Sequence, residues 1–63
     1  MNIQVLLDLI PYGERVRVFC TTTKKTYVEI NTVDFKIQVV EECHNSEVLS
    51  ISPVNNTLWV TVV

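Results

Sequence analysis

Apolar residues change their spacing along this chain, from a helical period near the amino terminus to strict alternation further on. The first ten residues carry apolar side chains at the i, i+3, i+4 and i+7 positions of one helix face. Asn2 is a suitable N-cap, and Pro11 disfavours helical geometry at the residue before it. The pattern predicts a short helix over residues 2–10, with an apolar stripe formed by Ile3, Leu6, Leu7 and Ile10.

Strict alternation of apolar and polar residues follows and predicts a β-hairpin. Residues 15–20 form the first strand, the polar run 21–25 the connection, and residues 26–32 the return strand. Successive side chains of a strand point to opposite faces, so each strand has an inward and an outward set. The inward set is expected to contain Val16, Val18, Cys20, Val28 and Ile30.

The outward face of this hairpin is expected to combine cationic and aromatic side chains. Arg15, Arg17 and Phe19 come from the first strand, and Tyr27 comes from the second. Aromatic rings beside basic residues are one way in which proteins bind single-stranded nucleic acids. Glu29 and other acidic residues lie among these bases in the sequence, which favours an ordinary solvated surface. The four cationic and aromatic residues are the candidates for binding a partner or ligand.

Residues 33–43 fit two patterns. Phe35, Ile37 and Val39 alternate as in a strand, whereas Asp34 could cap a helix that carries Phe35 and Val39 on one face. β-Branched residues favour a strand. Two glutamates near the carboxyl end of such a helix would oppose its macrodipole. We therefore predict a third strand here, with a short helix as the alternative.

The carboxyl-terminal part predicts a second hairpin, with strands over residues 48–52 and 57–63. The last strand carries apolar side chains on both faces. Leu58, Val60 and Val62 lie on one side, and Trp59 and Val63 lie on the other. One helix can cover only one of these faces. The other face is expected to meet a second subunit or a target through Trp59, Thr61 and Val63.

These segments predict a single α+β domain over residues 1–63, with a short N-terminal helix packed on a small antiparallel sheet of four to five strands. A small curled barrel is the alternative arrangement. Within the sheet, Leu49 and Ile51 are expected to share one face. Hydrophobic residues make up 48% of the chain, more than so small a core can enclose. Self-association as a homo-oligomer is the simplest use for the remainder.

Few residues could carry chemistry. Cys20, Cys43 and His44 are the only soft metal ligands, and a structural zinc site normally takes four ligands at recurring spacing. Cys43 and His44 are adjacent, so on a strand they would point to opposite faces. We predict no metal site, no cofactor and no catalytic residue, and hence no enzyme. The two thiols are expected to be free in a reducing cytoplasm.

Charge and hydropathy limit the choice of partners. The net charge is −2, which disfavours a dedicated nucleic-acid binder. No apolar run approaches the roughly 18 residues of a membrane span, and the first ten residues lack the basic start of a signal peptide. A cytoplasmic protein is therefore expected. In an oligomer, copies of Arg15 and Arg17 could converge on one small anionic, phosphate-containing ligand.

The arrangement of residues 6–13 and 15–18 at the start, and of residues 48–51 and 57–60 at the end, resembles that of short accessory proteins of bacterial phages and prophages. The resemblance implies a class that includes inhibitors of host defence systems. The expected function is a non-enzymatic inhibitor that binds a host protein in the host cytoplasm as a homo-oligomer. Two alternatives stay open: an oligomer that sequesters a small anionic, nucleotide-like ligand, and a small nucleic-acid-binding barrel.

Overall fold

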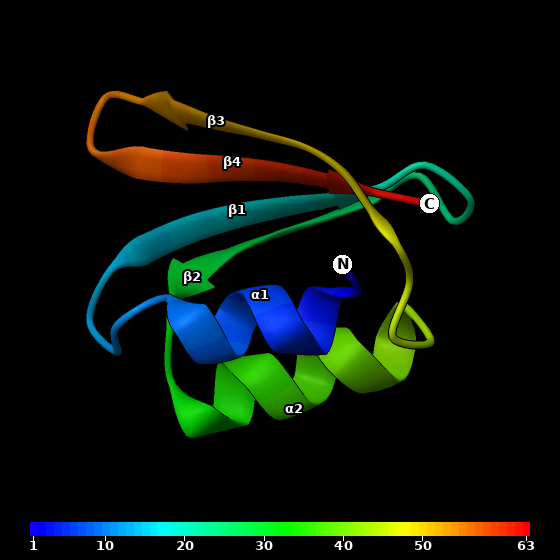
Figure 1. Ribbon diagram of the computed structural model, residues 1–63, viewed down its shortest axis with the longest axis horizontal. Coiled ribbons are helices and arrows are strands. Elements are labelled where there is room, and N and C mark those ends of the chain that lie inside the picture. Colours follow the sequence, from blue (N-terminus) through cyan, green and yellow to red (C-terminus); the bar gives the residue numbers. More distant parts are fainter.

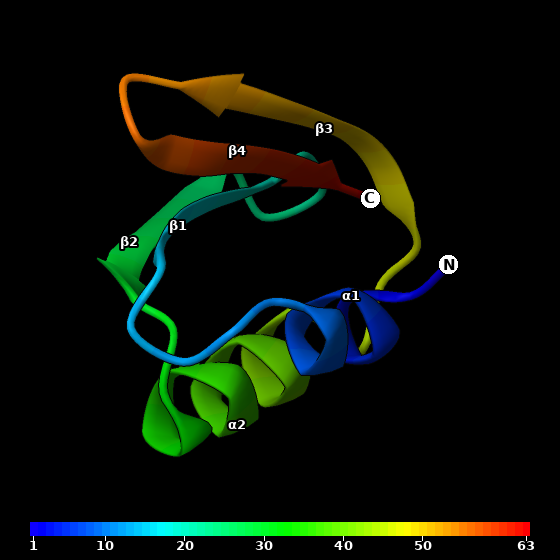
Figure 2. The ribbon, with the colours of Figure 1, turned by 60° about the vertical axis from the view of Figure 1, so that its left-hand side comes forward.

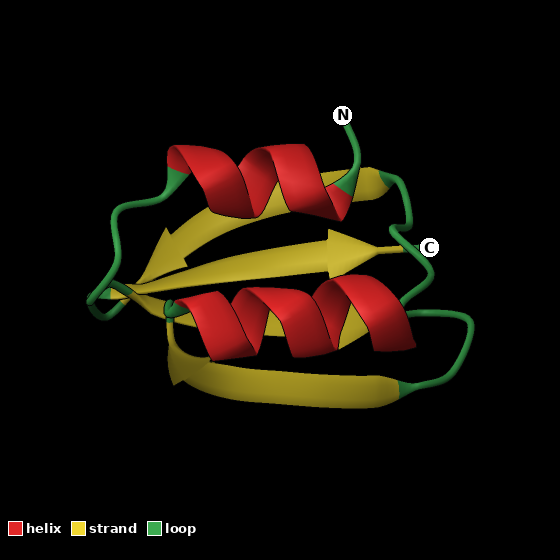
Figure 3. Cartoon of the chain, turned by 90° about the horizontal axis from the view of Figure 1, so that it is seen from below, coloured by secondary structure: helices red, strands yellow, loops and turns green.

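Two helices pack side by side on one face of a four-stranded sheet (Figure 1). The computed structural model describes all 63 residues. Seen from the helix side, α1 lies over the β3–β4 half of the sheet and α2 over the β1–β2 half (Figure 3). The elements are α1 (Ile3–Leu9), β1 (Arg15–Cys20), β2 (Lys25–Ile30), α2 (Val33–Glu42), β3 (Val48–Val54) and β4 (Thr57–Val62).

The sheet consists of two hairpins joined side by side. Its strand order is β2-β1-β4-β3. Each hairpin is antiparallel, whereas the two inner strands, β1 and β4, run parallel with Val18 opposite Val60. The predicted α+β class, the N-terminal helix and the four strands are confirmed. The sheet is mixed and open, so it does not close into a barrel.

The N-terminal helix begins and packs as its sequence predicts. The side chain of Asn2 accepts a hydrogen bond from the backbone N–H of Val5 at 2.9 Å, which satisfies one of the free donors of the first turn. Ile3, Leu6 and Leu7 are buried against the sheet. Helix α1 has only seven residues, too few to persist alone, so it depends on this packing.

The prediction of a third strand over residues 33–43 was wrong, because the segment forms α2. Thr32 caps this helix, and its side-chain oxygen accepts a hydrogen bond from the backbone N–H of Phe35 at 3.1 Å. Phe35 and Val39 are buried on the sheet. Their spacing suits a helix face, and burial of that face outweighs the strand preference of β-branched residues.

Strand β2 has its faces reversed relative to the prediction. Tyr27 pairs with Val18 and therefore points toward the helices, whereas Val28 pairs with Arg17 on the opposite side. The Tyr27 hydroxyl donates to a carboxylate oxygen of Glu42 at 3.0 Å. Tyr27 can bury its ring and still place its hydroxyl at the helix surface, which explains why it takes the inward position.

A bulge between Val48 and Ser50 shifts the register of β3. Val48 pairs with Val62 and Ile51 pairs with Val60, so these two residues of β3 face the helices. Leu49 lies in the bulge and is 57% exposed. The expectation that Leu49 and Ile51 share a face was wrong, because the extra residue interrupts the alternation.

The core lies between the helices and the sheet. All of its side chains point into this single layer. Both hairpins and both helices contribute to the core. Its members are Ile3, Leu6, Leu7, Val16, Val18, Cys20, Phe35, Val39, Cys43, Val60 and Val62.

Asn31 is the one buried polar residue, and it joins three segments. Its side-chain amide donates to the carbonyl oxygens of Leu7 at 3.2 Å and Ile10 at 2.9 Å. Its backbone exchanges hydrogen bonds with the turn before β1, accepting from the N–H of Gly13 and donating to the carbonyl of Glu14. These bonds hold the end of α1 against the junction of β2 and α2.

Leu7→Ala should destabilise the fold by about 2–5 kcal/mol, because it opens a cavity at a fully buried position. Leu9→Ala is the matched control, since Leu9 is on the same helix but 68% exposed. Urea unfolding followed by circular dichroism measures both. Equal stabilities of Leu7→Ala and wild type would contradict the docking of α1.

Asn31→Asp should destabilise the fold by about 1–3 kcal/mol. The substitution keeps the size of the side chain but replaces the donated bonds with a carboxylate close to the Leu7 and Ile10 carbonyl oxygens. Gln4→Glu, an exposed exchange of amide for acid, should remain within about 1 kcal/mol of wild type. Similar thermal unfolding of the two variants would show that the Asn31 amide does not join these segments.

A candidate binding face on the sheet

The face of the sheet opposite the helices carries no cover (Figure 2). Residues that lie opposite one another on neighbouring strands share a face, so the register identifies the uncovered set. We call this set the open face. It contains Arg15, Arg17 and Phe19 of β1, Thr26, Val28 and Ile30 of β2, Ser50, Ser52 and Val54 of β3, and Thr57, Trp59 and Thr61 of β4.

A cation–π pair occupies the centre of the open face. Arg17 and Trp59 are direct partners on the two parallel inner strands, and the Arg17 guanidinium carbon lies 4.2 Å from the centre of the Trp59 ring. Such a pair contributes on the order of 0.5–1 kcal/mol at an exposed site. Trp59 remains 41% exposed. The pair therefore holds both side chains in place while leaving much of the indole accessible.

Apolar side chains adjoin this pair, Phe19 on β1 itself and Val28 and Ile30 on the neighbouring strand β2. Phe19 is half-buried. Val28 and Ile30 are 50% and 45% exposed, on the same face. Two serines occupy most of the β3 side, where Ser52 lies opposite Trp59, and Val54 lies at the end of the strand opposite Thr57. The open face thus has a cationic and aromatic centre with an apolar flank and a polar flank.

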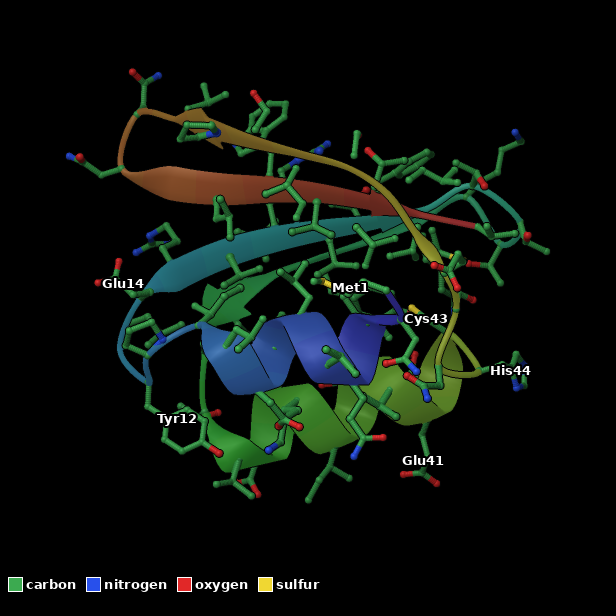
Figure 4. All side chains as sticks on the ribbon, viewed as in Figure 1. Met1, Tyr12, Glu14, Glu41, Cys43 and His44 are labelled. Carbon is green, nitrogen blue, oxygen red and sulfur yellow. The ribbon has the colours of Figure 1, made fainter.

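Basic side chains lie on both sides of the molecule, but acidic side chains are absent from one of them. The chain has seven acidic residues, and none lies on the open face, which carries Arg15 and Arg17. Glu29 pairs with Val16 and so belongs to the helix side. Glu41 points away from the sheet on the far side of α2 (Figure 4). The open face is cationic although the whole chain has a net charge of −2.

The structure brings together most of the residues that the sequence singled out. Arg15, Arg17 and Phe19 lie on the open face with Trp59 and Thr61. Tyr27 does not, because it faces the helices, and its assignment to the same surface was wrong. Val63 follows β4 and is 43% exposed.

Sequence reasoning missed Val28 and Ile30 as part of this surface. It also missed the pairing of Arg17 with Trp59. Alternation assigns faces within one strand but does not say which distant strands become neighbours. No signal in the sequence marks the parallel pairing of β1 with β4.

The two cysteines form a buried pair in the core. Both are free thiols, both belong to the apolar core, and each influences the pKa of the other. The Cys20 thiol also donates to the carbonyl oxygen of Val63 at 3.1 Å. Cys43 follows the last residue of α2 and is buried, so it is a core residue, whereas His44 lies exposed beyond it (Figure 4). No group of three or more His, Cys, Asp or Glu side chains is placed to hold a metal ion.

The surroundings of the thiols shift their pKa values in opposite directions. Burial raises the pKa of Cys43 to about 11, with the nearby Cys20 adding to the effect. Burial also acts to raise the pKa of Cys20, but hydrogen bonds from Thr23 and Thr22 outweigh it and leave that pKa below its usual value. Burial and the hydrogen bond to Glu42 raise the pKa of Tyr27 to about 12.

Comparisons with family models, curated proteins and solved structures find no match to this chain. Neither helix is long and apolar enough to cross a membrane. Function therefore has to be argued from the open face itself.

The raised pKa of Cys43 predicts a loss of stability at alkaline pH. In the unfolded chain the thiol returns to its ordinary value of 9.0, so the protonated thiol stabilises the folded state fully below that pH. This contribution, about 2 kcal/mol, should be lost as the pH rises from about 9 to about 11. Urea unfolding at pH 8 and pH 10.5 measures it.

Cys43→Ala is the matched variant, because it removes the Cys43 titration and keeps Tyr27 and Cys20, whose pKa values depend on Cys43 only as a lesser cause. Its free energy of unfolding should fall less than that of wild type over the same interval. Parallel pH profiles for the two proteins would contradict the assignment.

Proposed function

We propose that this chain is a non-enzymatic binding protein that docks an acidic surface of a partner protein through the open face. The observation that carries the proposal is the Arg17–Trp59 pair at the centre of a face without acidic side chains. Trp and Arg are among the residues most enriched in the energetic hot spots of protein interfaces. Here the two are already held together, so little side-chain freedom is lost when a partner binds.

The flanks of the open face support a protein partner over a nucleic acid. Val28 and Ile30 present apolar surface, and a phosphate backbone offers nothing apolar to cover them. Only Arg15 and Arg17 are cationic on this face, whereas nucleic-acid sites usually carry many phosphate contacts. A protein surface with apolar residues beside carboxylates would match both features.

The shape of the open face favours a macromolecule over a small ligand. Small-molecule sites are concave and enclose most of the ligand. Arg15 and Thr57, at one end of the open face, line a surface hollow, but no hollow is lined by Arg17, Phe19 or Trp59 at its centre. A centre without a hollow suits the surface of another macromolecule, and this argues against sequestration of a nucleotide there within one chain.

The biological setting follows from the resemblance to phage and prophage accessory proteins. In that setting the partner would be a host protein in the host cytoplasm, and occupation of an acidic functional surface would inhibit it. The chain needs no chemistry of its own to do this, because a tightly bound domain excludes other ligands from the surface that it covers.

Trp59→Ala should lower the affinity for the partner by about 2 kcal/mol or more, which is roughly 30-fold. The partner is first captured from bacterial lysate on the immobilised wild-type chain and then purified. Binding of wild type and variants to the purified partner is measured by calorimetry. Gln38→Ala, an exposed change on α2, is the control and should bind as wild type does.

Three outcomes would contradict the proposal: equal binding by Trp59→Ala and wild type, loss of binding in Gln38→Ala, and a double variant Arg15→Ala/Arg17→Ala that binds as wild type does. The double variant should itself unfold within about 1 kcal/mol of wild type, since it changes surface residues. Tight, steeply salt-dependent binding of a single-stranded oligonucleotide would instead assign the open face to nucleic acid.

A further inference from the structure

Strand β2 forms an edge of the sheet that is regular along its whole length. Its six residues pair with β1 without a shift, and no other strand lies on its outer side. The opposite edge, β3, contains a bulge and Pro53. Bulges and prolines are features by which proteins discourage pairing at sheet edges, and β2 has neither.

The charges on β2 are arranged symmetrically about its centre. Lys25 and Glu29 lie two residues before and two residues after Tyr27, and all three belong to the helix side of the strand. Charged residues on an edge strand ordinarily oppose pairing with another strand. Two antiparallel copies of β2 centred on Tyr27 would instead place each Lys25 opposite a Glu29.

We propose that two copies of this chain associate through antiparallel pairing of β2 with β2, centred on Tyr27. Lys25 of each copy then faces Glu29 of the other, and Thr26 faces Val28. Cross-strand pairs of opposite charge stabilise a sheet, whereas like charges destabilise it. The two four-stranded sheets join into one continuous sheet.

Other alignments of the two β2 strands pair Lys25 and Glu29 less favourably. A shift of the centre by one residue in either direction keeps the helices on one side but leaves Lys25 and Glu29 opposite uncharged residues. A shift by two residues places Lys25 opposite Lys25, or Glu29 opposite Glu29. The charge pattern thus specifies one register.

Pairing at β2 also agrees with the charge of the open face. A symmetric dimer formed through the open face would bring the arginines of both copies together, since Arg15 and Arg17 of each copy would meet the same cationic surface. Pairing at the edge keeps the two open faces on the same side of the joined sheet and leaves both accessible. Val28 of one copy then lies diagonally across from Val28 of the other, which reduces its exposure from the 50% of the single chain.

The test is sedimentation equilibrium of the full chain from low to high micromolar concentration at low salt. A strand pair buries less area than the roughly 800 Å² per partner of a standard interface, so a reversible dimer in the micromolar range is expected. Lys25→Glu and Glu29→Lys should each weaken the dimer at least tenfold, because each places like charges opposite one another. Both positions are exposed, so both variants should keep the wild-type melting curve when monomeric.

The decisive sample is an equimolar mixture of the two variants. Lys25→Glu makes positions 25 and 29 of its chain both acidic, and Glu29→Lys makes the same two positions of the other chain both basic. Opposite charges then face one another at both pairs of a mixed dimer, so dimers should reappear in the mixture at concentrations where each variant alone is monomeric.

A wild-type monomer at every concentration, undiminished dimers of the single variants, or a mixture that stays monomeric would each overturn the proposal. Loss of the dimer in Trp59→Ala would overturn it too, by locating the interface on the open face. The sedimentation measurement does not depend on the proposed function, because it uses no partner protein.

Discussion

The chain contains enough helix to cover one face of its sheet and no more. Helices of seven and ten residues lie against four strands, and every residue of the apolar core points into the layer between them. No segment of residues 1–63 covers the open face, which is therefore either solvated or covered from outside these residues. Its composition decides between these outcomes. A solvated face would be expected to mix both signs of charge, whereas this one combines a Trp, a Phe and two arginines with no acid.

The parallel pairing of β1 with β4 converts this uncovered area into an organised surface. Arg17 and Trp59 are far apart in the sequence, yet they become direct neighbours because the two inner strands pair in register. The same pairing places Val18 beside Val60 in the core on the other face. Packing of the core and organisation of the open face thus depend on one register, since a slip of one residue would exchange the two faces. A variant that disturbs the core register should disturb the surface with it.

The sequence predicts those features that depend on neighbouring residues. The N-cap of α1, the outward residues of β1 and the position of Trp59 all follow from local spacing, and all agree with the structure. Features set by distant contacts are missed. Residues 33–43 carry a strand-like composition, but Phe35 and Val39 are buried as one helix face. Tyr27 exchanges places with Val28 because its hydroxyl reaches Glu42 on α2, and the bulge in β3 moves Ile51 but not Leu49 to the helix side. Each difference arises where burial or a tertiary hydrogen bond outweighs a local preference.

The most direct test of the open face as a binding surface is amide chemical-shift mapping of the isotope-labelled chain during titration with its purified partner. Shifts should concentrate on β1 and β4, and the indole N–H of Trp59 should move with them, because the Arg17–Trp59 pair lies at the centre of the contact. The amides of α2 should remain unchanged. Shifts confined to α1 and α2, with an unmoved Trp59 indole signal, would contradict the account.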